Sequence, residues 1–422
     1  MGRVRELFRS RPIFSWALYD WANSVFATTV IAGFFPVFFK QYWNAGVDPV
    51  VSTARLGFAN SAASVFILIA APILGALADG GASRKRYLGV FTALGIAASA
   101  GLWFVGEGDW SSAATVYALG SIGFSGAIVF YDALLVSVSP PARYDEVSAF
   151  GFSLGYIGGG LLFAVNVAMT LSPDTFGLSG AAEAVRLSFL TVAAWWLVFS
   201  IPLFRNVSEP PRIDAAGSAA AVGLRSLVKT LREYRNHRMA GLFLLAYFFY
   251  IDGVHTIIRM AVDYGLSLGF PSDSLIVALL IVQFVGFPAA LVYGLVAGRV
   301  GPKPALYFGV VVYVGVTVWA YFMTTIAEFY ILAVVIGLVQ GGVQAISRSF
   351  YARYVPAAQS GEFFGFFNMI GRFATIVGPS LVAVTGLLTG SSRLGILSVI
   401  VLLVIGMVLL SFVREREQAA PF

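Results

Sequence analysis

Twelve apolar stretches, each long enough to cross a membrane, constrain this chain more than any other feature of its sequence. A helix needs about 20 predominantly apolar residues to cross roughly 30 Å of hydrocarbon. Only 11% of the residues are charged, against about a quarter in soluble domains. The sequence therefore predicts an all-α membrane protein with twelve transmembrane helices. We place them at residues 15–39, 55–78, 87–106, 112–138, 147–171, 185–203, 239–263, 273–297, 303–323, 327–350, 362–388 and 393–413.

The positive charges predict how these helices are oriented. If both termini are cytoplasmic, all but six of the 27 Lys and Arg residues belong to cytoplasmic segments, with Arg348 counted at the inner end of the tenth span. Such an excess is typical of cytoplasmic loops. We therefore expect cytoplasmic termini in a multi-pass protein of the cell (inner) membrane, and no nucleic-acid partner despite the net charge of +6. The six exceptions are Lys40, Arg55, Arg186 and Arg393 in outer loops, and Arg259 and Arg372 within spans.

A polar interruption at residues 204–238 divides the twelve stretches into six and six. We expect an N-terminal six-helix bundle over residues 1–203 and a C-terminal six-helix bundle over residues 239–422. Between them, apolar residues repeat at helical spacing from Leu224 to Tyr234 beside basic ones, which predicts an amphipathic helix on the cytoplasmic surface. This layout is typical of transporters whose two bundles rock around a central site.

The short link between the second and third spans indicates an inner gate. Its glycines allow close helix packing, and its acid can pair with the basic cluster that follows. The gate residues are Gly75, Asp79, Arg84 and Arg86. This link resembles the G-x-x-x-D-x-x-x-x-[RK]-x-[RK] signature of the major facilitator superfamily. A second copy, from Gly294 to Lys303, has Gly298 in place of the acid. The resemblance implies the major facilitator fold, in which the two six-helix bundles are pseudo-symmetric.

Three further stretches resemble one branch of that superfamily, the autophagy-related vacuolar amino-acid effluxers and their bacterial relatives. The stretches are Tyr19-Asp-Trp-Ala-Asn-Ser24 running on to Pro36, Phe130-Tyr-Asp-Ala-Leu-Leu135, and Gly341–Ser349 continuing to residues 362–367. The resemblance implies solute transport, with amino acids as the best-known cargo. Two residues depart from the family pattern. Asp132 stands where an amide is common, and Arg372 stands where Lys is usual, so the role of Asp132 does not carry over from the family.

The seventh span holds the richest set of charged side chains. Asp252, His255, Arg259 and Asp263 follow one another at offsets of three, four and four, which places all four on one helix face. One interpretation is a ladder of internal ion pairs. The other is that Arg259 binds a substrate carboxylate or phosphate, while Asp252 or His255 exchanges protons.

Asp20 and Asp132 lie at similar depths in the first and fourth spans, where an acid is costly and usually faces an interior path. In the superfamily that the sequence resembles, these two helices line the central cavity. The two acids are therefore expected to approach each other as a proton site. The alternative is that Asp20 belongs to an inner-gate latch or a local hydrogen bond. Its partners would then be Arg11, Arg143, Tyr19 or Asn23.

The remaining candidates for solute contact lie in the first, tenth and eleventh spans. Arg372 is flanked by packed glycines and needs a counter-charge, from an acid on another helix or from a bound anion. The amides of Asn23 and Gln344 can contact a polar solute, and interhelical hydrogen bonding is the alternative for each.

These observations predict a secondary transporter that moves a small solute, an amino acid or a related amphipathic molecule, by proton-coupled alternating access. The chain has no cysteine, two histidines and no nucleotide-binding motif, which argues against an enzyme, a metal site or a cofactor. Two alternatives stay open: a non-transporting receptor or assembly factor on a transporter fold, and an exporter of drugs or lipid-like amphiphiles. We expect a monomer whose partners are the solute, protons and the lipid bilayer.

Overall fold

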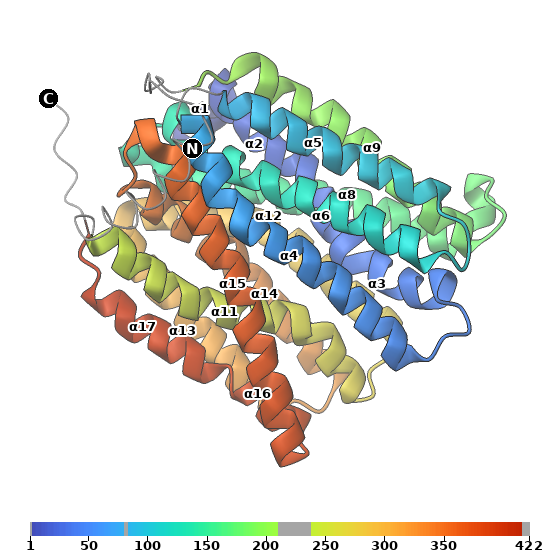
Figure 1. Ribbon diagram of the computed structural model, residues 1–422. Coiled ribbons are helices and arrows are strands. Elements are labelled where there is room, and N and C mark those ends of the chain that lie inside the picture. The colour runs from blue at the N-terminus through green and yellow to red at the C-terminus, as the bar shows by residue number, and fades with distance from the viewer. Residues whose placement is uncertain (1, 80–82, 210–237, 416–422) are drawn as a thin grey trace, which may run out of the picture.

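The computed structural model describes residues 2–79, 83–209 and 238–415 of the chain (Figure 1). Within these ranges lie twelve helices long and apolar enough to cross a membrane, which confirms the predicted all-α architecture. Six of them precede residues 210–237 and six follow, and we refer to these sets as the N-terminal and C-terminal halves. The amphipathic helix predicted from Leu224 to Tyr234 lies outside the described residues.

In the N-terminal half, a short helix α1 precedes six spans, and the first span has four consecutive segments. These segments are α2 (Arg11–Val25), η1 (Phe26–Phe34), α3 (Phe35–Phe38) and η2 (Phe39–Trp43), and α1 is Gly2–Arg9. The other helices are α4 (Pro49–Asp79), α5 (Arg84–Gly101), α6 (Trp110–Ala133), α7 (Leu135–Val138), α8 (Tyr144–Leu171) and α9 (Ala181–Asn206), with single turns η3 (Leu102–Phe104), η4 (Pro141–Arg143) and η5 (Pro173–Phe176).

The C-terminal half also contains six spans. Its helices are α11 (Arg238–Ser267), α12 (Ser272–Val300), α13 (Pro302–Phe322), α14 (Ile326–Ala352), α15 (Ser360–Thr389), α16 (Ser392–Leu397) and α17 (Ile400–Phe412), with a single turn η6 (Ala357–Gln359). The last span consists of α16 and α17 together.

Side chains define where the helices that carry the site begin. Asp109 precedes α6 and accepts the Ser112 N–H at 3.1 Å, and hydrogen bonds from Ser112 hold the pKa of Asp109 below its usual range. Thr325 and Glu328 form a capping box at the start of α14, with the Glu328 carboxylate accepting the Thr325 N–H at 2.9 Å. These caps satisfy backbone donors that the first turn of a helix leaves free.

The first span is not a regular α-helix. Through η1 the backbone forms hydrogen bonds between residues five apart, ending with the Phe35 N–H on the Val30 carbonyl. Such π-helical segments are rare and frequently occur at functional sites. Here Thr28 and Ile31 of η1 line the cavity between the halves. The irregular stretch therefore belongs to the part of the span that faces the interior.

The two halves are packed together at the end of the bundle that carries both termini. Helix α4 packs along α15, and α8 packs along α12 and α14. At the α4–α15 crossing the backbones touch, because a Cβ at Gly75 would collide with the Gly361 carbonyl oxygen, and one at Gly365 would lie 2.7 Å from the Ala71 carbonyl oxygen. Away from this crossing, α4 and α15 diverge (Figure 1).

Polar contacts reinforce the closed end. Asp145 at the start of α8 accepts hydrogen bonds from Ser349 at 2.5 Å and from Arg353 at 2.7 Å. A further hydrogen bond joins the halves at the middle of the spans, where Gln283 donates to Thr28 at 2.8 Å. The bundle is therefore sealed at the end with the termini and is held less tightly at the other end.

Candidate functional site in the central cavity

A cavity of about 390 Å³ lies between the two halves at mid-bundle. Its wall comes from the first, fourth and fifth spans on one side and from α11, α12, α14 and α15 on the other. Seven residues selected from the sequence as contacts for solute or protons line it. They are Asp20, Asn23, Asp132, His255, Arg259, Gln344 and Arg372. The structure therefore gathers most of the selected side chains around one space, with Asp252 as the exception.

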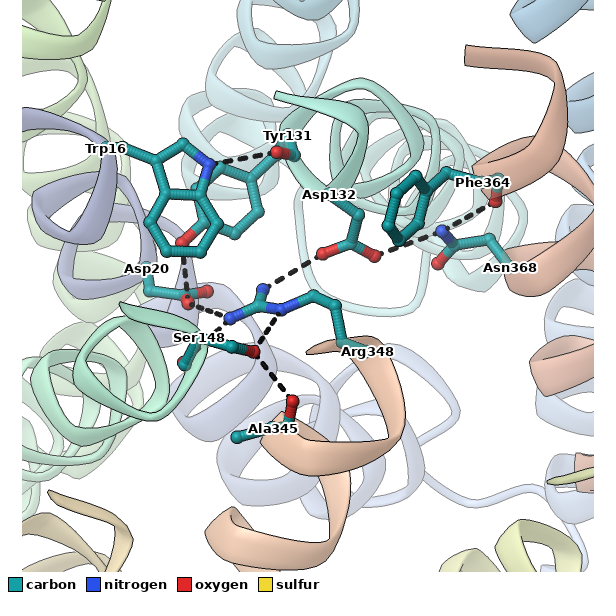
Figure 2. A network of polar contacts seen from close by, with 9 residues as sticks. All are labelled: Trp16, Asp20, Tyr131, Asp132, Ser148, Ala345, Arg348, Phe364 and Asn368. Atoms are coloured by element: carbon teal, nitrogen blue, oxygen red, sulfur yellow. Dashed lines mark hydrogen bonds and ion pairs between the residues drawn. The ribbon is translucent and has the colours of Figure 1, made fainter. Parts of the chain in front are cut away.

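Arg348 on α14 bridges two acids of the other half (Figure 2). Its Nη1 donates to Asp132 Oδ1 at 2.9 Å, and its Nη2 lies 3.6 Å from Asp20 Oδ2. The guanidinium also donates from Nε to Ser148 Oγ and from Nη2 to the Ser148 carbonyl, both at 2.9 Å. Only 3% of the Arg348 side chain is exposed, so this ion pair across the two halves is buried. We call Asp20, Asp132 and Arg348 the central triad.

Neighbouring polar groups fix both carboxylates of the central triad. The Tyr131 hydroxyl donates to Asp20 Oδ2 at 2.8 Å, and the Asn368 amide donates to Asp132 Oδ2 at 3.1 Å (Figure 2). Asn368 belongs to α15, so a second helix of the C-terminal half also reaches these acids. Each acid therefore has a partner besides Arg348.

Aromatic rings enclose the Arg348 guanidinium. Its central carbon lies 4.5 Å from the ring centre of Phe152, 4.8 Å from Trp16 and 5.4 Å from Tyr131. Trp16 in turn donates its indole N–H to the Tyr131 carbonyl at 3.0 Å. A planar guanidinium interacts favourably with ring faces. The N-terminal half thus forms a shaped receptor for a side chain that comes from the other half.

The role of Arg348 was not predicted from the sequence. In the sequence, Arg348 belongs to the stretch from Gly341 that resembles the family, and its position near a span end places it among the predicted cytoplasmic charges. That placement was wrong, because α14 continues to Ala352 and Arg348 is buried inside the bundle. The signal that could have found it was its place inside the predicted tenth span, where a cation needs an anion on another helix.

The predicted latch between Asp20 and the nearby arginines does not form. Arg11 is exposed at the start of α2. Arg143 lies 3.3 Å from Glu6 and 3.5 Å from Glu146 instead. The expectation was wrong because both arginines lie at the end of the bundle with the termini, whereas Asp20 lies deeper. The acid therefore pairs with the opposite half rather than with its own.

Helix α11 places its charged residues in different surroundings. His255 and Arg259 line the cavity, whereas Asp252 is fully buried against α15, where its Oδ1 accepts the Gly378 N–H at 3.0 Å. Asp263 is exposed. Among the described residues no ion pair joins Arg259 to His255 or Asp263, so the predicted ladder is absent there. The shared face predicted for these four residues therefore serves two purposes, helix packing and cavity lining.

Arg372 reaches across the cavity to the N-terminal half. Its guanidinium donates a short hydrogen bond to the Ser125 hydroxyl on α6. Arg372 and Arg259 both line the cavity and act electrostatically on each other. The cavity therefore has a cluster of positive charge apart from the central triad.

Three of the four predicted gate residues meet at the closed end. Asp79 Oδ1 accepts hydrogen bonds from Arg84 Nη2 at 2.5 Å and from the Gly361 N–H at 3.0 Å, while its Oδ2 accepts the Glu362 N–H at 2.7 Å. These N–H groups belong to the first turn of α15, which favours a negative charge. Gly75 provides the close approach of α4 to α15. Arg86, the fourth, is exposed. We call Asp79, Arg84 and the start of α15 the rim latch.

Comparison with known proteins agrees with this architecture. The family described as "Vacuole effluxer Atg22 like" matches residues 9–140 and 137–420. The chain belongs to the Atg22-like family. An uncharacterised transporter of the major facilitator superfamily type, YxiO of Bacillus subtilis, is 44% identical over 405 residues, covering 95% of this chain and 94% of that protein. Autophagy-related protein 22 of Yarrowia lipolytica is 27% identical over 310 residues, covering 65% of this Atg22-like chain and 51% of the fungal protein.

Solved structures of low sequence identity share the fold. The human organic anion transporter MFSD10 superposes with a TM-score of 0.72 at 16% identity, over 95% of this chain and 99% of that one. The transporter FucP, in its outward conformation, gives a TM-score of 0.67 at 12% identity, over 96% of this chain and 100% of that one. Together with the family match and the 44% identity to YxiO, this fold makes the Atg22-like protein a transporter of the major facilitator superfamily. Its relatives and structural neighbours are transporters and not enzymes.

Proposed function

We propose that this Atg22-like protein is a proton-coupled secondary transporter that moves a small solute through the central cavity by alternating access. The observation that carries the proposal is the central triad, which sets two acids against one arginine across the two halves. For the cavity to open toward the end with the termini, α14 must move away from the N-terminal half. The triad is thus both a titratable group and a contact that the transport cycle has to break.

The charge of the central triad supports proton binding. With both carboxylates ionised, the triad has a net charge of −1, and with one carboxylate protonated it is neutral. An uncompensated buried charge is strongly unfavourable. One proton therefore stabilises the triad, and its arrival or departure changes how strongly Arg348 is held.

Asp20 is the acid that we expect to take this proton. Its side chain is 13% exposed against 6% for Asp132, and it lies 3.6 Å from Arg348 against 2.9 Å. The Tyr131 hydroxyl can donate to an ionised Asp20 or accept from a protonated one. Protonation of Asp20 leaves Arg348 with one carboxylate partner and so changes the free energy needed to part the halves.

The closed end indicates which way the cavity faces. If the termini are cytoplasmic, as the distribution of Lys and Arg predicts, this structure is an outward-facing state in the cell (inner) membrane. The rim latch then holds the cytoplasmic side shut. Release of a proton and of the solute toward the cytoplasm, or the reverse sequence, would each complete a cycle.

Small amphipathic solutes fit the size of the cavity, and amino acids are the first class to test. Its volume lies within the usual range of about 300–1,000 Å³ for small-molecule sites. An adjoining pocket of about 250 Å³ has a mainly apolar lining, which favours export of lipid-like amphiphiles as a second candidate. A receptor without transport activity is the remaining alternative.

The test is uptake into proteoliposomes of purified protein, with amino acids, peptides, sugars and amphipathic drugs, each with and without a pH gradient. We expect at least one class to accumulate with the gradient, and Asp20→Asn to abolish accumulation while solute exchange persists. Asp174→Asn, at an exposed loop acid, is the matched control. Unchanged gradient-driven transport in both Asp20→Asn and Asp132→Asn would refute proton coupling through the triad. If no solute moves, the transporter proposal fails and the receptor alternative replaces it.

A further inference from the structure

We propose that the transported solute is an organic anion, whose acidic group binds at Arg259 and Arg372 and whose apolar body occupies the adjoining pocket. This inference rests on the proposed function only in assuming that the bound anion is then transported. The binding that it describes is independent of any proton gradient.

The cavity wall offers cations to a ligand and no available anion. Three arginines line it, Arg259, Arg348 and Arg372, against two aspartates, and both aspartates already face Arg348. With one proton bound the central triad is neutral, and it then has little attraction left for a further charge. Among the described residues, the cavity wall therefore has an excess of positive charge. This charge lies at Arg259 and Arg372, apart from the central triad.

Arg259 is the group best placed to receive an acidic ligand. No described residue forms a hydrogen bond or an ion pair with its side chain, although it faces the cavity. An arginine binds a carboxylate or a phosphate through two parallel hydrogen bonds. One turn earlier on α11, His255 also lines the cavity, and its buried Nδ1 has no hydrogen-bond partner in the described part of the chain. A bound oxyanion would satisfy both side chains.

An ammonium group finds no equivalent place. Asp252, the remaining acid on this part of α11, is fully buried and turned toward Gly378. Aromatic rings in the wall can contact a cation. However, a cation there would also face the arginines, and repulsion between like charges in a cavity of low dielectric outweighs a ring contact. The wall therefore selects an anion over a zwitterion with the same body.

The apolar pocket beside the cavity defines the rest of the ligand. The two spaces share Ala27, Thr28, Ile258, Gln283 and Gln340 in their linings, so they adjoin. Beyond these shared residues, the smaller pocket is bounded mainly by aliphatic and aromatic side chains of α11, α12 and α14. A ligand with its acidic group at Arg259 can extend an apolar chain into this space, whose burial adds to affinity.

The experiment compares four ligands with the same branched body and different charge. The probes are 4-methylpentanoate, 3-methylbutyl phosphate, leucine and leucinamide, each added to full-length protein in nanodiscs, with binding measured by thermal stabilisation. Comparison of the first two probes shows whether the site prefers a carboxylate or a phosphate. We expect 4-methylpentanoate, 3-methylbutyl phosphate or both to bind about ten- to a hundred-fold more tightly than leucinamide. The affinity of leucine should lie between that of the acids and that of leucinamide.

Variants identify the binding group. Arg259→Gln should lose most of the preference for the acids and Arg259→Lys should retain part of it, while Arg205→Gln, at an exposed arginine, should leave binding unchanged. Asp20→Asn should bind the acids at least as tightly as the original protein. Thus a loss of gradient-driven transport with intact acid binding bears on proton coupling alone. Three results would overturn the proposal. Leucine or leucinamide could bind as tightly as the acids, neither acid could bind, or Arg259→Gln could bind the acids as tightly as the original protein.

Discussion

The rim latch and the central triad, two charged clusters between the halves, differ in how their charges balance. In the rim latch, Asp79 faces one arginine, Arg84, and two backbone N–H groups. In the central triad, one arginine faces two acids, Asp20 and Asp132. The rim latch is neutral as it stands, whereas the triad becomes neutral only with a proton. We therefore assign mechanical closure to the rim and the response to protons to the centre.

Of the substitutions that test this difference between the clusters, removal of Arg348 should have the largest effect on stability and transport. Arg348→Met leaves two buried carboxylates without a cation, and breaking a buried ion pair in this way costs about 3–5 kcal/mol. We expect a sharp loss of thermal stability and no transport, measured by thermal unfolding in detergent and by proteoliposome uptake. The triple variant that adds Asp20→Asn and Asp132→Asn should regain stability but not proton coupling. A single Arg348→Met variant as stable as the original protein would contradict the buried triad.

Neutralising one acid in each cluster should separate their roles. A pH gradient of one unit can drive about tenfold accumulation of a solute that moves with one proton. Asp20→Asn should reduce this ratio to about one, whereas Asp79→Asn should lower the rate and keep the ratio. Steady-state accumulation at several external pH values measures both quantities. Equal loss of the ratio in the two variants would remove the distinction between the two clusters.

Opening of the closed end should follow weakening of the rim latch. Asp79→Asn removes the charged acceptor of two N–H groups and of Arg84, a loss of about 1–3 kcal/mol. The chain has no cysteine, so spin labels at Arg205→Cys and Arg299→Cys report on the two halves without background. We expect the distances between the labels to shift toward longer values in Asp79→Asn. An unchanged distribution would indicate that other contacts, such as those of Asp145 with Ser349 and Arg353, hold this end shut.

The smallest effect should come from the fourth residue of the gate motif. Arg86→Gln should leave melting temperature and uptake unchanged, because Arg86 is exposed, whereas Arg84→Gln should weaken closure. The same uptake and label-distance measurements test both variants side by side. A loss in Arg86→Gln equal to that in Arg84→Gln would show that the motif acts through surface charge and not through the latch.

The sequence predicts the fold and much of the site for one physical reason. Charges inside apolar stretches are costly, so Asp20, Asp132 and Arg259 stand out in the sequence alone. The partner of the two acids did not stand out, because Arg348 lies near a helix end, where a cytoplasmic and a buried arginine look alike in sequence. The fate of Asp252 depends on which helix packs against α11. That information resides in the packing of distant segments and not in local periodicity.

The π-helical segment η1 makes the length of the first span matter as much as its composition. An α-helix turns by about 100° per residue, and a stretch bonded at intervals of five holds more residues in each turn. A single α-helical wheel drawn through α2 and α3 therefore does not give the correct relative directions of their side chains, including that of Asp20. If the π-helical hydrogen bonds persisted after deletion of one residue within Phe26–Phe34, Asp20 would rotate by somewhat less than about 100° relative to Phe35. Asp20 would keep its present face only if the stretch returned to α-helical hydrogen bonding. The count of residues in this stretch thus sets the direction in which the acid points.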